Sequence, residues 1–144
     1  MFRTRFIRKL AGARDGTSAV EFAIIFPIFL IVLIGLVVYG AYFGDVHGVQ
    51  QLTAEAARAS VAGINDGERL SLAKGNIDAN VSFYPMLSPT RLTIDSAGTD
   101  PVTSTFTATV RYDASDLFIF LLPQLLPAPD PVIVRTAAIQ KGGY

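Results

Sequence analysis

Residues 22–43 read FAIIFPIFLIVLIGLVVYGAYF, and none of them carries a charge. As an α-helix this run is about 33 Å long, which is enough to cross the hydrocarbon core of a bilayer. A cleaved secretory signal has a shorter apolar core, of about 7–15 residues, followed by a small-x-small cleavage site. This run is longer and ends in Tyr39, Tyr42 and Phe43, aromatic residues typical of a membrane interface. The sequence therefore predicts a retained membrane-spanning helix, with a removed signal as the alternative.

Charge is distributed unevenly on the two sides of the apolar run. The 144 residues include 12 basic and 12 acidic side chains. The five basic residues before Gly16 are opposed only by Asp15, whereas from Asp45 onward ten acidic residues face seven basic ones. A basic flank stays in the cytoplasm, so the N-terminus is predicted to be cytoplasmic and residues 45–144 to lie across the membrane. No basic surface remains for nucleic acid once the N-terminal flank is set aside.

Residues that carry chemistry are few. The chain has no cysteine, which excludes disulfides, thiolate metal sites and cysteine nucleophiles, and its single histidine is His47. A lone histidine just past the apolar run is read as a surface or packing residue. Asp113 and Asp116 lack a third partner and are read as solvated loop residues. We therefore predict no enzymatic activity, no catalytic residues, no metal and no cofactor.

A helical pattern continues beyond the apolar run. In residues 45–62 apolar and small side chains recur at three- and four-residue steps and give one mild apolar face: Val46, Val49, Leu52, Ala56, Ala59 and Ser60. Gly63 and the Asn-Asp-Gly of residues 65–67 then end the pattern. One helix is thus expected from about Ser18 to Ala62, apolar all round in its first half and amphipathic in its second.

The remaining residues predict a small α+β domain. Residues 68–80 form a short second helix, and residues 91–140 hold strands and loops. Three strands are expected, at 91–95, 103–112 and 131–140, with a turn at 96–101. In the second strand Phe106, Ala108, Val110 and Tyr112 share one face. The predicted fold is α+β: a long N-terminal transmembrane and amphipathic helix packed on a small antiparallel sheet of three to four strands.

Residues 117–126, LFIFLLPQLL, form a second apolar run that is too short to cross a bilayer and is broken by Pro123. The favoured interpretation is a loop packed on the domain core. The alternative is an exposed patch for a partner subunit or for the membrane surface.

Gly40, Gly44 and Gly48 are spaced by four residues and therefore form one ridge on a helix. Such ridges let two backbones approach closely, so a helix-packing face is predicted here. Its partner is either another subunit or the protein's own soluble domain.

The segment before the apolar run allows two interpretations. Ser18 and Glu21 have the spacing of a capping box, with Ser18 as the N-cap and Glu21 reaching back to its N–H. A carboxylate in the first turn also suits the helix dipole. Capping does not account for Gly16, nor for the apolar run that starts directly at Phe22.

The second interpretation is a processing signal. Residues 15–23 read DGTSAVEFA: a short basic leader ends in glycine, a glutamate is the fifth residue after it, and an aromatic follows. This order, with Pro27 further on, resembles the TadE-like pseudopilins of the tight-adherence (Tad/Flp) type IV pilus system. The close resemblance covers about residues 14–60, and the helix-then-strands layout also suits the family.

The resemblance implies how the chain is divided and processed. Residues 1–16 would be a basic prepilin leader, which a prepilin peptidase removes by cutting between Gly16 and Thr17. Residues 17–44 would be the transmembrane helix and residues 45–144 an extracytoplasmic pilin-like domain. Glu21 and Phe22 would act in assembly and recognition, because a membrane-buried carboxylate can pair with the new α-ammonium of a neighbouring subunit.

The same resemblance implies partners, location and role. The partners would be the prepilin peptidase, other pilins and pseudopilins, the inner-membrane assembly platform and the lipid bilayer. The protein would cross the bacterial inner membrane once, with a periplasmic C-terminal domain, and its incorporation into the filament stays open. The additional domain favours a minor, priming or assembly role over that of bulk filament subunit. The alternative is an unprocessed, signal-anchored protein with a small periplasmic binding domain.

Overall fold

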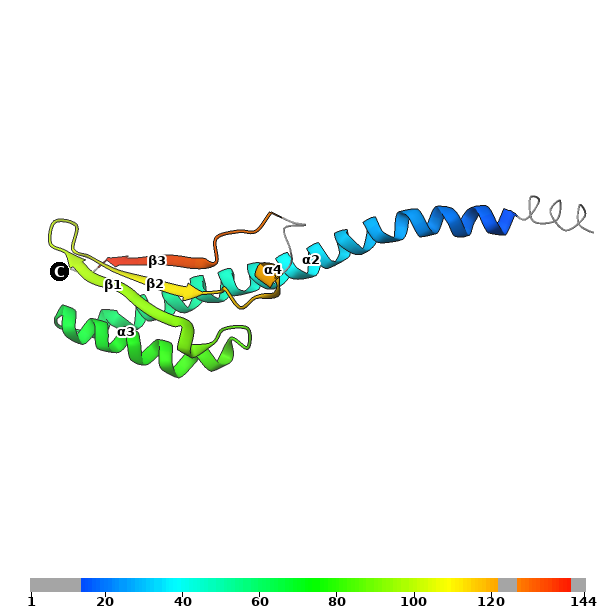
Figure 1. Ribbon diagram of the computed structural model, residues 1–144. Coiled ribbons are helices and arrows are strands. Elements are labelled where there is room, and N and C mark those ends of the chain that lie inside the picture. Colours follow the sequence, from blue (N-terminus) through cyan, green and yellow to red (C-terminus); the bar gives the residue numbers. More distant parts are fainter. Residues whose placement is uncertain (1–13, 122–126, 141–144) are drawn as a thin grey trace, which may run out of the picture. The chain divides into compact units, whose positions relative to one another are not determined.

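The computed structural model describes residues 14–121 and 127–140 (Figure 1). Its contacts divide the chain into two units, Met1–Val37 and Val38–Tyr144. The long helix α2 (Arg14–Ala59) contributes to both units and ends in a short 3-10 turn at Ser60–Ala62. The second unit adds a second helix and an antiparallel sheet, so the α+β, pilin-like fold predicted from the sequence is confirmed.

The second half of α2 presents one buried face to the domain. Four of the six residues predicted for that face are fully buried: Val49, Leu52, Ala56 and Ser60. The buried hydroxyls of Thr53 and of Ser60, which begins the 3-10 turn, donate to backbone carbonyls of α2: Thr53 to Val49 at 2.6 Å and Ser60 to Ala57 at 2.6 Å. Polar side chains therefore lie on the buried face without leaving their hydroxyls unsatisfied.

Helix α3 (Asp66–Asn80) begins two residues before the predicted start of the second helix. Asn65 is its N-cap, because the Asn65 side-chain oxygen accepts a 2.9 Å hydrogen bond from the Glu68 N–H. The Glu68 carboxylate in turn accepts from the Ile64 N–H at 2.9 Å. This reciprocal arrangement satisfies donors that a helix start otherwise leaves free. The Asn-Asp-Gly of residues 65–67 thus starts α3 as well as ending the preceding pattern.

The three strands of the described residues form one antiparallel sheet in the order β1-β2-β3. They are β1 (Leu92–Asp100), β2 (Thr105–Asp113) and β3 (Val132–Gln140). The alternation predicted for the central strand is confirmed, since Phe106, Ala108, Val110 and Tyr112 are all buried.

The turn predicted at 96–101 is wrong. Strand β1 continues to Asp100, with a bulge between Ile94 and Ser96, and pairs with β2 as far as the Asp100–Thr105 pair. The chain turns at residues 101–104. The first of these is Pro101, which has no N–H to donate to a strand ladder. Asp100 starts this turn by accepting a 2.8 Å hydrogen bond from the Val102 N–H.

The core joins the second half of α2, helix α3 and the inner face of the sheet. Leu52, Ile77, Tyr112 and Ile133, one residue from each of α2, α3, β2 and β3, represent its buried members. Figure 1 shows the sheet beside α3 and the last turns of α2. The amphipathic part of α2 is thus the cover that the apolar face of the sheet requires.

The apolar run 117–126 is described only as far as residue 121, and residues 122–126 lie outside the described residues. Residues Phe118–Leu121 form a single helical turn, α4. Ile119 of this turn is buried, as the favoured interpretation expects, whereas Phe118 and Leu121 are 57% and 69% exposed. The described part of the run therefore has one side in the core and one side open.

Candidate functional site

The residues predicted for processing lie near the N-terminal limit of the described part of α2. Gly16 and Thr17 are both helical, as are Arg14 and Asp15 before them. Ser18 is therefore an interior helical residue in the unprocessed chain, and the prediction that it is the N-cap is wrong. The backbone of Arg14, Asp15 and Gly16 is helical although glycine disfavours a helix, so the described helix already includes the residues before Ser18. Cleavage after Gly16 remains a prediction.

Glu21 and Phe22 follow within the first unit. Glu21 is exposed, and the Phe22 ring packs on Phe26 one turn later, with centroids 5.1 Å apart. From Val20 to Val37 most large apolar side chains of α2 are exposed. A helix that is apolar all round and uncovered requires lipid or other protein around it. Of the described helices, α2 alone is long and apolar enough to cross a membrane, by length and composition.

The three glycines of the predicted ridge have different surroundings. A methyl group on Gly48 would lie 3.2 Å from Leu87 Cδ1, and one on Gly44 would lie 3.1 Å from Met86 Sδ. At Gly40 no atom of the described residues lies within 4 Å of such a methyl group. Close approach at Gly44 and Gly48 is thus to the protein's own loop, residues 83–87. The part played by the ridge in helix packing between subunits stays a prediction.

Two tyrosines of the apolar run are held by the C-terminal part of the domain. The Tyr39 hydroxyl donates to the Pro127 carbonyl, and the Tyr42 hydroxyl donates to the Asp130 carbonyl at 3.1 Å. The Tyr42 ring also meets Phe120 edge to face, with centroids 6.5 Å apart. The sequence indicated interfacial aromatics at these positions but gave no sign of these partners, which are about 80 residues or more away along the chain.

Asp45 is a buried carboxylate of the kind often found at functional sites, and no role was predicted for it from the sequence. Its side chain is fully buried, and neither carboxylate oxygen has a hydrogen-bond partner among the described residues. Burial, reinforced by the Asp116 carboxylate, raises the pKa of Asp45 from 3.8 to about 6. A signal was present: Asp45 precedes Val49 by four residues and so falls on the apolar face of α2.

The other polar candidates lie on the domain surface. His47 is exposed, Asp116 forms an ion pair with Arg91 at 2.8 Å, and Asp113 accepts a 3.0 Å hydrogen bond from the Ser115 N–H. In residues 14–121 and 127–140 no group of three metal-ligating side chains comes together. Nothing in the described part of the chain assembles a nucleophile, a base and an orienting group.

These features define a class: a protein with a long apolar N-terminal helix whose second half forms part of a small α+β domain of pilin type. Comparison with protein families gives a more specific result for the helix: residues 16–58 match the TadE-like protein family. Over these residues the chain is similar to that family, whose members are pilus components not known as enzymes. Searches of the curated proteins and of the solved structures found no match.

Proposed function

We propose that this protein is a minor pilin or pseudopilin that acts in the assembly or initiation of a tight-adherence pilus. The observation that supports the proposal is the TadE-like match, which runs from the predicted scissile glycine at residue 16 to the end of α2. The matched segment is followed by a folded α+β domain, which packs on one face of the second half of α2. This favours a priming or assembly role.

In the proposed cycle the protein is inserted with its basic flank in the cytoplasm, and a prepilin peptidase cuts between Gly16 and Thr17. The bond lies in helical backbone, so cleavage requires local unwinding, which has a cost in free energy. Gly16 lowers that cost, since glycine is about 1 kcal/mol less favourable than alanine in a helix. Local unwinding at Gly16 would then expose an extended backbone to the peptidase.

Cleavage would give Glu21 its task. The new N-terminus at Thr17 is an α-ammonium group, and Glu21 lies about one helical turn away from it. Burial of either charge alone in lipid is costly, whereas a pair formed between neighbouring subunits lowers the cost of both. The pair would set the register of one subunit against the next.

The decisive experiment is the N-terminal sequence and intact mass of the full chain extracted from membranes of cells with and without an active prepilin peptidase. We expect Thr17 as the first residue only where the peptidase is active. Replacement of Gly16 by a bulky residue should abolish this cleavage while membrane insertion persists. An N-terminus at Met1 in cells with the active peptidase would refute the proposal and favour the unprocessed, signal-anchored alternative.

Assembly is tested separately from cleavage. Glu21→Gln keeps the size of the side chain and removes its charge, so cleavage should continue while the recovery of assembled pili falls. Asp78→Asn, an exposed aspartate on α3, is the matched control and should leave piliation unchanged. Normal piliation with Glu21→Gln would remove the pairing role assigned to Glu21.

A further inference from the structure

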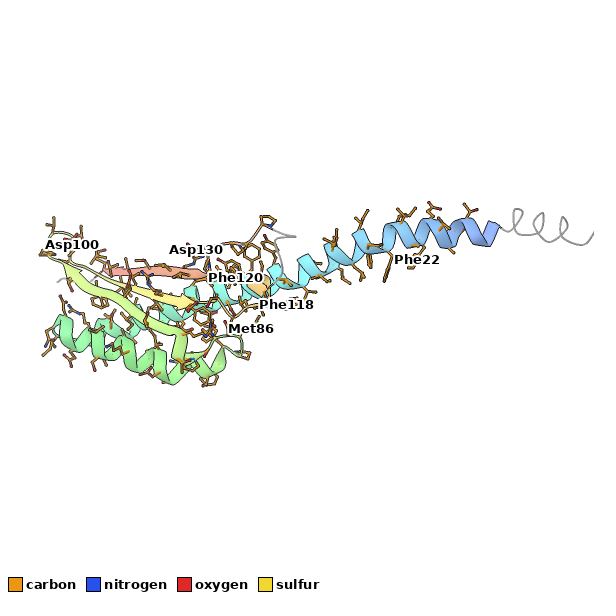
Figure 2. The ribbon with its side chains drawn as sticks, in the orientation of Figure 1. Phe22, Met86, Asp100, Phe118, Phe120 and Asp130 are labelled. Atoms are coloured by element: carbon orange, nitrogen blue, oxygen red, sulfur yellow. The ribbon has the colours of Figure 1, made fainter. Side chains whose placement is uncertain are left out.

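One end of the α+β domain carries exposed apolar side chains from three separate segments of the chain. Phe83 and Met86 come from the loop after α3 and are 76% and 47% exposed. Phe118 and Leu121 come from α4. With Phe43 of α2, which is 54% exposed, they form what we call the apolar rim: Phe43, Phe83, Met86, Phe118 and Leu121. Figure 2 shows Met86 and Phe118 at the end of the domain away from Asp100.

Contacts with α2 show beside which residues of that helix the rim lies. Tyr39 and Tyr42 hold the Pro127 and Asp130 carbonyls, and Gly44 lies against Met86. The segments on either side of the rim therefore meet α2 over Tyr39–Gly44. This stretch covers the last turn of the uncharged run, which is about 33 Å long against a hydrocarbon core of about 30 Å. Whatever packs beside it lies at the level of the lipid headgroups.

The chemistry of the rim suits that level. Neither of its loops, residues 83–87 and 117–121, contains a charged residue. Aromatic and large apolar side chains are favoured where the headgroups meet the acyl chains, and a domain without them there would expose only polar surface. Single exposed apolar residues elsewhere, such as Val102, are ordinary for a folded protein.

We propose that the apolar rim inserts into the outer interfacial layer of the bilayer and anchors that end of the folded domain at the membrane surface in the unassembled subunit. The occupant is lipid rather than a second protein, because the rim is continuous with the apolar run of α2 through Phe43. The proposal rests on the membrane insertion that the proposed function requires, but not on cleavage or pilus assembly. Since the rim is uncharged, insertion should depend neither on anionic lipid nor on salt.

The chain contains no tryptophan, which makes a site-specific test simple. The full chain with Phe83→Trp or Phe118→Trp is reconstituted in phosphatidylcholine vesicles with or without bromine atoms in the upper acyl chains, which quench nearby tryptophan. Val102→Trp, at the opposite end of the domain and 90% exposed, is the matched control. Phe29→Trp, within the apolar run, reports whether α2 itself has inserted.

We expect brominated lipid to reduce emission at positions 83, 118 and 29 and to leave position 102 unchanged. Quenching at 29 without quenching at 83 and 118 would overturn the rim proposal, while membrane insertion of α2 would still be supported. Absence of quenching at 29 would overturn both. Shielding of positions 83 and 118 from brominated lipid and also from aqueous iodide would mean that a second protein covers the rim, and this would overturn the proposal as well.

Circular dichroism of each variant checks that the domain is folded. A second measurement uses the absence of cysteine: Phe83→Cys and Val102→Cys carry a spin label in the same vesicles. The label at 83 should be more accessible to oxygen, which concentrates in lipid, and the label at 102 to a water-soluble nickel complex. Equal accessibility patterns at the two positions would refute insertion of the rim.

Discussion

Replacement of Asp45 by asparagine should stabilise the domain at neutral pH. The carboxyl group is fully buried on α2, has no hydrogen-bond partner among the described residues and lies near the Asp116 carboxylate. Its ionised form is therefore destabilised in the folded state, and the pKa of Asp45 rises from 3.8 to about 6. Asparagine has nearly the same shape and no charge at any pH.

The magnitude follows from the change in pKa. Each pKa unit corresponds to about 1.4 kcal/mol, so a rise from 3.8 to about 6 costs the folded state about 3 kcal/mol once Asp45 is ionised. The asparagine amide is itself a buried polar group, and an unsatisfied one costs about 1–3 kcal/mol, much as the protonated acid does. We therefore expect Asp45→Asn to gain about 1–3 kcal/mol in free energy of unfolding above pH 7.

The pH dependence has a definite sign. Between pH 3.8 and about 6 the folded protein holds more protons at Asp45 than the unfolded chain, so stability from this residue is full below pH 3.8 and is lost as pH rises through about 6. Hydrogen bonds from Val102 and from Ser115 lower the pKa of Asp100 and Asp113 respectively, and their contributions disappear only at still more acidic pH. The two effects thus fall in separate pH windows.

The assay is urea unfolding of the full chain in detergent micelles at pH 5 and pH 8, followed by the near-ultraviolet dichroism of buried Tyr112. Asp78→Asn on the surface of α3 is the control and should change stability by less than about 0.5 kcal/mol at both pH values. If Asp45→Asn is less stable than the original chain at pH 8, or loses as much stability between pH 5 and pH 8, the reasoning is wrong.

Three further substitutions test the packing, each by the same unfolding assay. Gly75→Ala on α3 has open space around the new methyl group and should stabilise the domain by about 0.5–1 kcal/mol; a loss would show that the helix is strained there. Gly63→Ala should destabilise it by about 1–3 kcal/mol, because the methyl group would lie 2.8 Å from the Arg69 backbone nitrogen; an unchanged midpoint would contradict this close approach. Leu52→Ala leaves a cavity in the core and should cost about 2–5 kcal/mol, so a cost below 1 kcal/mol would place Leu52 outside the core.

Most of the fold could be predicted from the periodic spacing of apolar residues. The face of α2 that covers the sheet was predictable because Val49, Leu52 and Ala56 recur at helical spacing and no competing pattern overlaps them. The central strand was predictable for the same reason, since strict alternation over Phe106 to Tyr112 has only one interpretation. In both elements local preference and tertiary packing require the same structure.

The errors occur where a local signal serves two elements. Ser96, Ala97 and Gly98 resemble a turn, yet the backbone at Gly98 pairs with Thr107, and sheet pairing overrides the local preference. Asn65 was read as a helix stop, although Asn65 and Glu68 also have capping-box spacing, and the structure uses them to start α3.

The contacts around Tyr39 and Tyr42 lay beyond sequence reasoning for a different reason. Their partners are the Pro127 and Asp130 carbonyls, and backbone carbonyls carry no residue-specific signal. Burial of Asp45 is an intermediate case: the helical spacing placed it on the apolar face, but only the packed domain shows that its carboxylate has no partner.

The surroundings of the glycine ridge bear on where subunit contacts can form in the proposed pilus. Gly44 and Gly48 already lie against residues 83–87 of the same chain, so a second helix cannot use their surface unless that loop moves. None of the described residues lies within 4 Å of a methyl group added at Gly40. For the proposed pilus we therefore expect the assembly contacts to fall on α2 from Gly40 back towards Glu21, the same segment whose large apolar side chains are exposed. In this proposal the first half of α2 contacts lipid and neighbouring subunits, whereas its second half packs in the core of the domain.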